Sequence, residues 1–223
     1  MRRPYFLTHL LKDIRLEWRS KDAINSMLFF ALLVVVLFSL AFDPTRESSR
    51  QIAGGILCVA TMFASVSALN QAWTRELRHQ VLDAQRMTPA PASSLFLGKV
   101  LANFLFVSIV EIILTPVFII FYNLHALGNG WLLALVLPLG TWALVVNGTF
   151  FAALSIRTRN RELLLPLILF PLFIPALLGM VLASSYILTG EQDPSLWIKM
   201  LAGYDVIYTT ICLLLFEVVL HAE

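Results

Sequence analysis

The sequence predicts an all-α polytopic membrane protein: six transmembrane helices, an N-terminal interfacial helix and a cytoplasmic helix between the second and third spans. Three observations predict this class: the composition, the number of long apolar segments, and the distribution of lysine and arginine. The 223-residue chain is 59% hydrophobic, only 13% of its residues are charged, and its mean hydropathy is +0.82. A soluble domain of this composition would have too little polar surface to cover its core. In addition, six apolar segments are long enough to cross a bilayer, and lysine and arginine gather on one side of them.

Each apolar segment has about the length that a membrane helix needs, which is roughly 20 residues. We expect the spans at approximately residues 25–42, 52–72, 95–122, 131–156, 163–188 and 197–220. The third span is the longest and contains Pro116, so it is expected to tilt or kink. The fifth holds Pro166, Pro171 and Pro175 and is therefore expected to bend.

The basic residues predict the orientation of these spans. Thirteen of the sixteen lysine and arginine residues fall on the side of the N-terminus, and three fall on the other side. Because short cytoplasmic loops carry the excess of lysine and arginine, both termini and the loops around residues 80 and 159 are expected in the cytoplasm. The loop around residue 125 is expected on the opposite side.

An amphipathic pattern precedes the first span, at residues 5–22. Basic residues occupy the other faces of this helix. The four apolar residues that recur with helical spacing are Leu7, Leu11, Ile14 and Trp18. This pattern is typical of a helix that lies in the membrane interface, so we expect an in-plane elbow before the first span. A solvated helix docked on a partner is the alternative.

A polar segment, TRELRHQVLDAQRMTPAPASS at residues 74–94, separates the second and third spans. Leu77, Val81 and Leu82 can form one apolar stripe on a short helix, which Pro89 and Pro91 would end. We expect this cytoplasmic helix to fit a groove on another protein. The expected docking residues are Arg75, Glu76, Arg78, Val81, Asp83 and Arg86.

Glu111 is an acidic residue deep inside the third span. An ionisable side chain at that depth is costly and indicates a function by default. Asn103 lies on a nearby face of the same helix, and Asn70 and Asn147 are candidate hydrogen-bond partners. Two interpretations stay open for Glu111: a role in a transport pathway, and an interhelical hydrogen bond.

Charged residues nearer the span ends are expected to contact the interface. Lys99 is expected to extend its ammonium group to the water at the cytoplasmic end of the third span. Asp205 is expected to anchor the opposite end of the last span, and Glu217 its cytoplasmic end.

The sequence contains no motif that predicts a catalytic activity. The stretch LGKV does not complete the GxxxxGK[ST] motif of a phosphate-binding loop, so no ATPase activity is expected. His125 is a lone loop histidine, and no Ser/His/Asp set, paired carboxylates or Cys/His spacing is present. We expect no catalytic residue, no metal site and no cofactor held by this chain, and the net charge of +2 without a basic cluster predicts no nucleic-acid partner.

Four long stretches, in this order, carry a family resemblance: LLKDIRLEWRSKDAINSMLFFALLVVVLFSLAFDP, LDAQRMTPAPASSLFLGKVLANFLF, NGTFFAALSIRTRNRELLLPLILFPLFIPALL and LAGYDVIYTTICLLLFEVVL. Together they resemble the CcmB family, the membrane permease subunit of the ABC system that handles haem for cytochrome c maturation. One departure is LDAQRMTP, where the family usually has an apolar leucine-rich stretch such as LEGLLLSP.

The resemblance implies a single ABC-2-like transmembrane permease domain over residues 1–223, in a bacterial inner membrane. It implies that residues 74–86 form the coupling helix that holds a partner ATPase, CcmA. Further implied partners are CcmC, CcmD, a second copy of the permease, and the haem chaperone CcmE, whose haem-loaded form is released when ATP is hydrolysed. Haem would then be handled by the complex, and this chain would transduce energy rather than form a haem channel.

Two alternatives stay open. A permease of a different ABC exporter would share the fold and the coupling helix. A secondary transporter would work without an ATPase and would need intramembrane ionisable residues such as Glu111 to couple an ion gradient.

Overall fold

A computed structural model describes residues 5–42, 47–73, 91–122, 129–155 and 161–221. Within these ranges the chain forms seven α-helices and one short 3-10 helix. Six of the helices are long and apolar enough to cross a membrane. The described part of the chain thus confirms the predicted all-α polytopic class.

The helices, in chain order, are α1 (Tyr5–Ser20), α2 (Asp22–Ala41), α3 (Glu47–Ala72), α6 (Ala92–Tyr122), η1 (Gly130–Leu132), α7 (Leu133–Ser155), α8 (Arg161–Thr189) and α9 (Ser195–His221). Each predicted span coincides with one long helix, with boundaries that differ by at most five residues. The helix predicted at residues 5–22 is confirmed as α1. The helix predicted at residues 74–86 lies outside the described residues.

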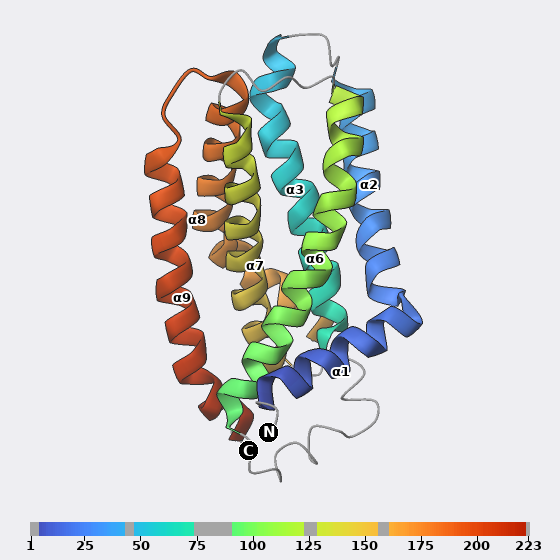
Figure 1. The fold of residues 1–223 in the computed structure, drawn as a ribbon, viewed down its shortest axis with the longest axis vertical. Helices are drawn as coiled ribbons and strands as arrows, with labels where there is room; N and C mark the ends of the chain where they lie inside the picture. The colour runs from blue at the N-terminus through green and yellow to red at the C-terminus, as the bar shows by residue number, and fades with distance from the viewer. Residues whose placement is uncertain (1–4, 43–46, 74–90, 123–128, 156–160, 222–223) are drawn as a thin grey trace.

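The six long helices stand side by side, and α1 lies across one end of the bundle (Figure 1). We call this end the α1 end; α2, α6 and α8 begin there, and α3, α7 and α9 end there. The opposite end, where η1 precedes α7, is the η1 end. In the same view α6 crosses the bundle obliquely, which confirms the tilt expected for this longest span.

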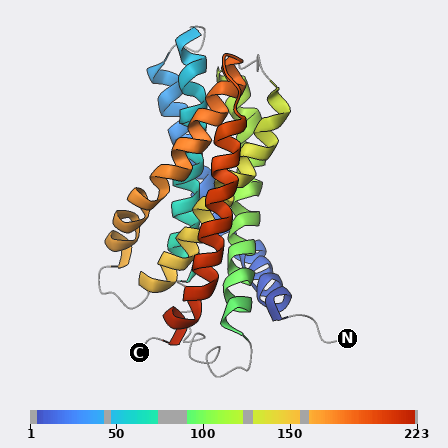
Figure 2. The same cartoon turned by 90° about the vertical axis from the view of Figure 1, so that its left-hand side faces the viewer.

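Neither set of prolines interrupts its helix. α6 continues through Pro116 to Tyr122, and α8 runs without a break from Arg161 to Thr189. Figure 2 shows that α8 diverges from the other spans at the α1 end, where it begins. Membrane helices tolerate proline where neighbouring groups satisfy the freed backbone carbonyls.

The outer surface of the described bundle is apolar. Large aliphatic side chains are exposed on several spans, among them Leu40, Ile112, Ile120, Val206 and Leu214. Soluble proteins rarely expose a continuous surface of this kind, whereas the hydrocarbon of a bilayer covers it at no cost.

The interior is built mainly from α3 and α7, which are the most buried spans. Small residues let their neighbours approach closely. A Cβ atom added to Gly54 of α3 would lie only 2.9 Å from the backbone nitrogen of Ser185 on α8. This close backbone contact is typical of membrane helix pairs, since dispersion forces rather than water expulsion hold them together.

A sharp corner joins α1 to α2. Lys21, between the two helices, has a left-handed backbone with φ of 57°. One carboxylate oxygen of Glu17 accepts hydrogen bonds from the backbone N–H groups of Ala23 (2.8 Å) and Ile24 (3.1 Å). A buried side chain of α1 therefore caps the first turn of α2, which confirms a corner before the first span.

The face of α1 that packs on the bundle differs from the predicted apolar stripe. Ile14 packs against the core together with Leu10, whereas Leu11 and Trp18 of the same stripe are exposed. The stripe therefore points largely away from the protein, and the interfacial position of α1 stays a prediction.

Candidate functional site

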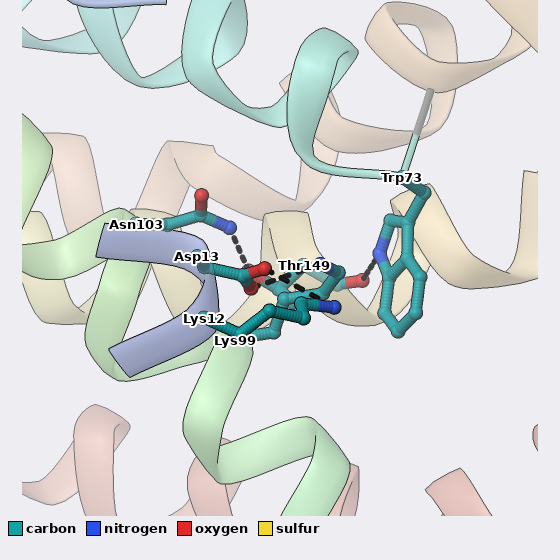
Figure 3. A network of polar contacts seen from close by, with 6 residues as sticks. All are labelled: Lys12, Asp13, Trp73, Lys99, Asn103 and Thr149. Atoms are coloured by element: carbon teal, nitrogen blue, oxygen red, sulfur yellow. Dashed lines mark hydrogen bonds and ion pairs between the residues drawn. The ribbon is translucent and has the colours of Figure 1, made fainter. Parts of the chain in front are cut away.

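Polar side chains from four parts of the chain meet near the α1 end (Figure 3). They come from α1, from the residue that follows α3, from α6 and from α7. We call this cluster the α1 junction: Lys12, Asp13, Trp73, Lys99, Asn103 and Thr149.

A close approach between α1 and α6 creates the junction. A Cβ atom added to Gly98 would lie 2.8 Å from the Cβ of His9 and 2.9 Å from the carbonyl oxygen of Phe6. Only glycine fits at this position, so α1 lies directly against the backbone of α6. The next residue of α6, Lys99, can therefore reach across to α1.

Lys99 is buried rather than extended to water, so the sequence prediction for this residue was wrong. Its exposed fraction is 3%, and its ammonium nitrogen lies 3.0 Å from a carboxylate oxygen of Asp13. The other oxygen of Asp13 lies 3.3 Å from the ammonium of Lys12. The reason is that α1 covers the start of α6 and supplies a counterion, which offsets the loss of hydration.

Trp73 connects the end of α3 to three other helices. The ammonium of Lys99 on α6 lies 4.7 Å from the centre of its ring, a cation–π distance. Its indole N–H donates a hydrogen bond to the carbonyl of Thr149 on α7 at 3.2 Å. Its ring also stacks on Phe216 of α9, with 6.1 Å between centroids. Trp73, which directly follows α3, thus contacts side-chain or backbone groups of three further spans, α6, α7 and α9.

The predicted docking helix begins directly after Trp73. Its six residues, Arg75, Glu76, Arg78, Val81, Asp83 and Arg86, lie outside the described residues. Their role stays a prediction, but the last described residue before them is locked into the bundle.

Asn103 belongs to the α1 junction and not to the surroundings of Glu111. Its side-chain amide donates to the hydroxyl of Thr149 at 3.2 Å. Asn103 and Glu111 are eight residues apart on α6, and this corresponds to about 12 Å along a helix. The structure therefore separates the two intramembrane polar residues that the sequence singled out.

Glu111 is buried in the middle of the bundle and accepts a hydrogen bond from Thr141 of α7, with 2.5 Å between the oxygens. The partners expected from the sequence were wrong in part, because the amide of Asn147 donates instead to Ala143 and to the hydroxyl of Tyr204. The antiparallel register of α6 and α7 explains this: Asn103 meets Thr149, so Glu111, two turns further along α6, meets a residue two turns earlier on α7.

Asp205 does not anchor the end of the last span, which corrects the prediction for this residue. It lies ten residues after the start of α9, about 15 Å along the helix, and its exposed fraction is 7%. Neither of its carboxylate oxygens has a hydrogen-bond partner among the described residues.

No group of three or more metal-ligating side chains occurs within the described ranges. Both cysteines, Cys58 and Cys212, are buried thiols, and His125 lies outside the described residues. The polar groups that the structure does bring together join one helix to another.

Sequence reasoning missed Asp13, Trp73 and Thr149. One signal was present: Gly98 permits a close helix contact, and the adjacent Lys99 requires a counterion if it is covered. A second signal was the spacing of Asp13 and Glu17, which places two acids on the same face of an otherwise basic helix.

Comparison with known proteins agrees with the resemblance of the four stretches. Residues 4–220 match the family described as CcmB protein. Heme exporter protein B of Rhodobacter capsulatus is 32% identical over 169 residues, which cover 76% of this chain and 77% of that protein. The proteins of the same name from Haemophilus influenzae and Bradyrhizobium diazoefficiens are 30% and 32% identical, over 78% and 82% of both chains compared.

Proposed function

This chain belongs to the CcmB family, and we propose that it is the membrane permease subunit of an ABC complex that exports haem for cytochrome c maturation. The observation that carries this proposal is the family match over residues 4–220. Relatives named heme exporter protein B cover three quarters or more of the chain, and six spanning helices supply the membrane domain of a permease. ATP is hydrolysed by a partner subunit, since the chain has no complete phosphate-binding loop.

The α1 end faces the cytoplasm of a bacterial inner membrane in this proposal. The bias of thirteen lysine and arginine residues to three supports this orientation. Both termini and the segment at residues 74–86 are then available to a cytoplasmic ATPase.

Residues 74–86 hold the ATPase, CcmA, as a coupling helix. A docking segment works only if its movement reaches the spans, and the position of Trp73 directly before it supports such a route. The contacts of Trp73 with Lys99, Thr149 and Phe216 reach α6, α7 and α9. Through Lys99 and Asp13 the same route reaches α1. Trp73 is therefore a positioning residue in this proposal.

The chain transduces energy rather than conducting haem. Two described intramembrane contacts, Thr141–Glu111 and Asn147–Tyr204, pair helix with helix and support this interpretation. Haem is handled by the assembly of this chain with a second copy of itself, CcmA, CcmC and CcmD, from which haem-loaded CcmE is released.

The experiment that tests this function is affinity purification of the full-length chain from its native membrane in mild detergent. Partner subunits are identified by mass spectrometry, and an absorption spectrum detects haem. The expected result is an ATP-binding subunit together with haem-containing partners. An ATP-binding subunit without haem proteins would indicate a different ABC exporter, and the absence of any ATP-binding subunit would favour a secondary transporter.

A further inference from the structure

α1 presents a basic face that points away from the bundle. Lys12, Arg15 and Arg19 follow one another at i, i+3 and i+7, so their side chains project to one side of the helix. Arg15 and Arg19 are exposed, and Lys12 is half-buried, with its ammonium also 3.3 Å from Asp13. The opposite face of α1 carries Leu10 and Glu17, which pack into the protein.

Exposed apolar side chains border the basic residues on both sides. Helical geometry places Leu11 and Trp18 along one border and Tyr5 and Leu16 along the other, and all four side chains are exposed. Trp18 is the most exposed of them, at 72%. A charged centre between apolar borders differs from the surface of a soluble helix, which is polar throughout its exposed face.

Two shallow grooves run along this face. The first has a volume of about 380 Å³ and is lined by Thr8, Leu11, Lys12, Arg15, Leu16 and Arg19. The second, of about 480 Å³, is lined by Leu11, Ile14, Arg15, Trp18 and Arg19. Both grooves therefore combine guanidinium groups with apolar walls.

The basic face lies at the level where the spans end. Figure 2 shows α1 on the outside of the bundle beside the first turns of α6, and Figure 1 shows that α1 meets the start of α2. In a bilayer that covers the apolar surface of the spans, this is the level of the phospholipid headgroups.

We propose that the outward face of α1 binds the headgroup of an anionic phospholipid. Guanidinium groups recognise phosphate oxygens through paired hydrogen bonds, so Arg15 and Arg19 are the main ligands and Lys12 adds a positive charge. The apolar borders contact the acyl chains, and tryptophan is enriched at this depth of the membrane. A free phosphate compound would gain nothing from these apolar borders, which is why a lipid is the occupant.

The cytoplasmic leaflet of bacterial membranes offers this ligand, and basic residues beside a span attract its anionic lipids. The bound lipid holds α1 from outside, while Asp13 holds it to Lys99 from inside. The lipid would thus keep α1 seated against α6.

The proposal is tested with the purified full-length chain in detergent, by native mass spectrometry during titration with phosphatidylglycerol or phosphatidylcholine. The wild-type chain is expected to retain phosphatidylglycerol more tightly. The double variant Arg15→Gln/Arg19→Gln is expected to bind it roughly thirtyfold more weakly, because each basic residue near the surface contributes about fivefold.

Two matched variants serve as controls. Lys199→Gln removes an exposed charge at the η1 end and should leave phosphatidylglycerol binding unchanged. Arg15→Lys/Arg19→Lys keeps the charge but loses the paired hydrogen bonds, so it should bind with intermediate affinity. Thermal unfolding of each variant verifies that the bundle is intact.

Three kinds of result would overturn the proposal. The first is equal binding of phosphatidylglycerol and phosphatidylcholine by the wild-type chain, or unchanged binding by the double Gln variant. The second is displacement of the lipid by glycerol 3-phosphate at a similar concentration, since this would indicate a site for free phosphate compounds. The third is loss of a co-purifying protein subunit from the double Gln variant with unchanged lipid binding, which would make the face a protein-docking surface.

Discussion

Lys99 of α6 and Asp13 of α1 form an ion pair at 3.0 Å across 86 positions of the chain. The lysine is almost fully enclosed, while the aspartate keeps some contact with the surroundings. An N-terminal helix that looks peripheral in the sequence is thereby joined to the third span. Several consequences of the proposed function can be measured at this contact and around it.

Removal of Asp13 should destabilise the protein more than removal of both members of the pair. Asp13→Ala removes the carboxylate that pairs with the buried ammonium group of Lys99, at a cost of about 3 kcal/mol. The double variant Asp13→Ala/Lys99→Met replaces the charge with an apolar side chain of similar length, so it should recover part of that loss. Thermal unfolding in one detergent gives the ranking, and a double variant no more stable than Asp13→Ala would contradict it.

Trp73→Phe should uncouple the ATPase from the spans without releasing it. Phenylalanine keeps an aromatic ring beside Phe216 but loses the N–H that donates to Thr149, a bond worth about 1 kcal/mol. The measurement compares the co-purified ATP-binding subunit with the amount of mature c-type cytochrome. Trp131→Phe, at an exposed tryptophan near the η1 end, is the control. Equal maturation in both variants would remove Trp73 from the coupling route.

Val81→Pro should abolish docking of the ATPase while the spans still insert. Proline in the interior of a helix costs about 3 kcal/mol or more, and Val81→Ala is the control that keeps the helix. Reversal of Arg75 and Arg78 to glutamate should have a smaller effect, since exposed ion pairs contribute no more than about 1 kcal/mol each. Pull-down of the ATP-binding subunit at matched membrane levels measures both. Full binding by Val81→Pro would mean that residues 74–86 are only a linker.

Glu111→Gln should be tolerated better than Glu111→Leu or Glu111→Lys. Glutamine keeps a carbonyl oxygen that can accept the hydroxyl of Thr141, whereas leucine leaves that hydroxyl unpaired at a cost of about 1–2 kcal/mol. Thermal stability and cytochrome maturation are the two readouts. If Gln and Leu reduce maturation equally while stability is retained, Glu111 has a role that requires its charge.

Reporter fusions should place the loops around residues 80 and 159, and both termini, in the cytoplasm. The reason is the concentration of lysine and arginine on that side of the spans. A fusion at residue 125 should report the opposite side. A cytoplasmic signal at residue 125 would contradict the proposed orientation.

The spans could be predicted from the sequence because each depends on a local property, the length of an apolar run. The side-chain pairs could not, because they depend on how two distant helices are rotated and aligned. Lys99 illustrates this: its local surroundings are those of a residue at a span end, and only α1, far earlier in the chain, changes its environment. Thr141 is a second case, since nothing near it in the sequence indicates that Glu111 lies opposite.

Asp205 is a third case: the sequence did not indicate how far this residue lies from the end of its span. Its position near one end of an apolar run predicted an interfacial residue, but it lies ten residues after the start of the 27-residue helix α9, and its exposed fraction is 7%. The burial of Asp205 depends on how α9 packs against the neighbouring helices, which the apolar run alone does not indicate.

The contact between Gly98 and α1 can form only at a late stage of synthesis, because the two parts lie far apart in the chain. A ribosome delivers α1 first, and the glycine and lysine that receive it follow only after the first two spans have been made. Until the third span enters the membrane, α1 has its contact with α2 but not with α6, and Asp13 lacks Lys99 as its partner. Packing of α1 against α6 therefore requires a chain that is at least half complete. In truncated products that stop before α6, α1 would lack this contact.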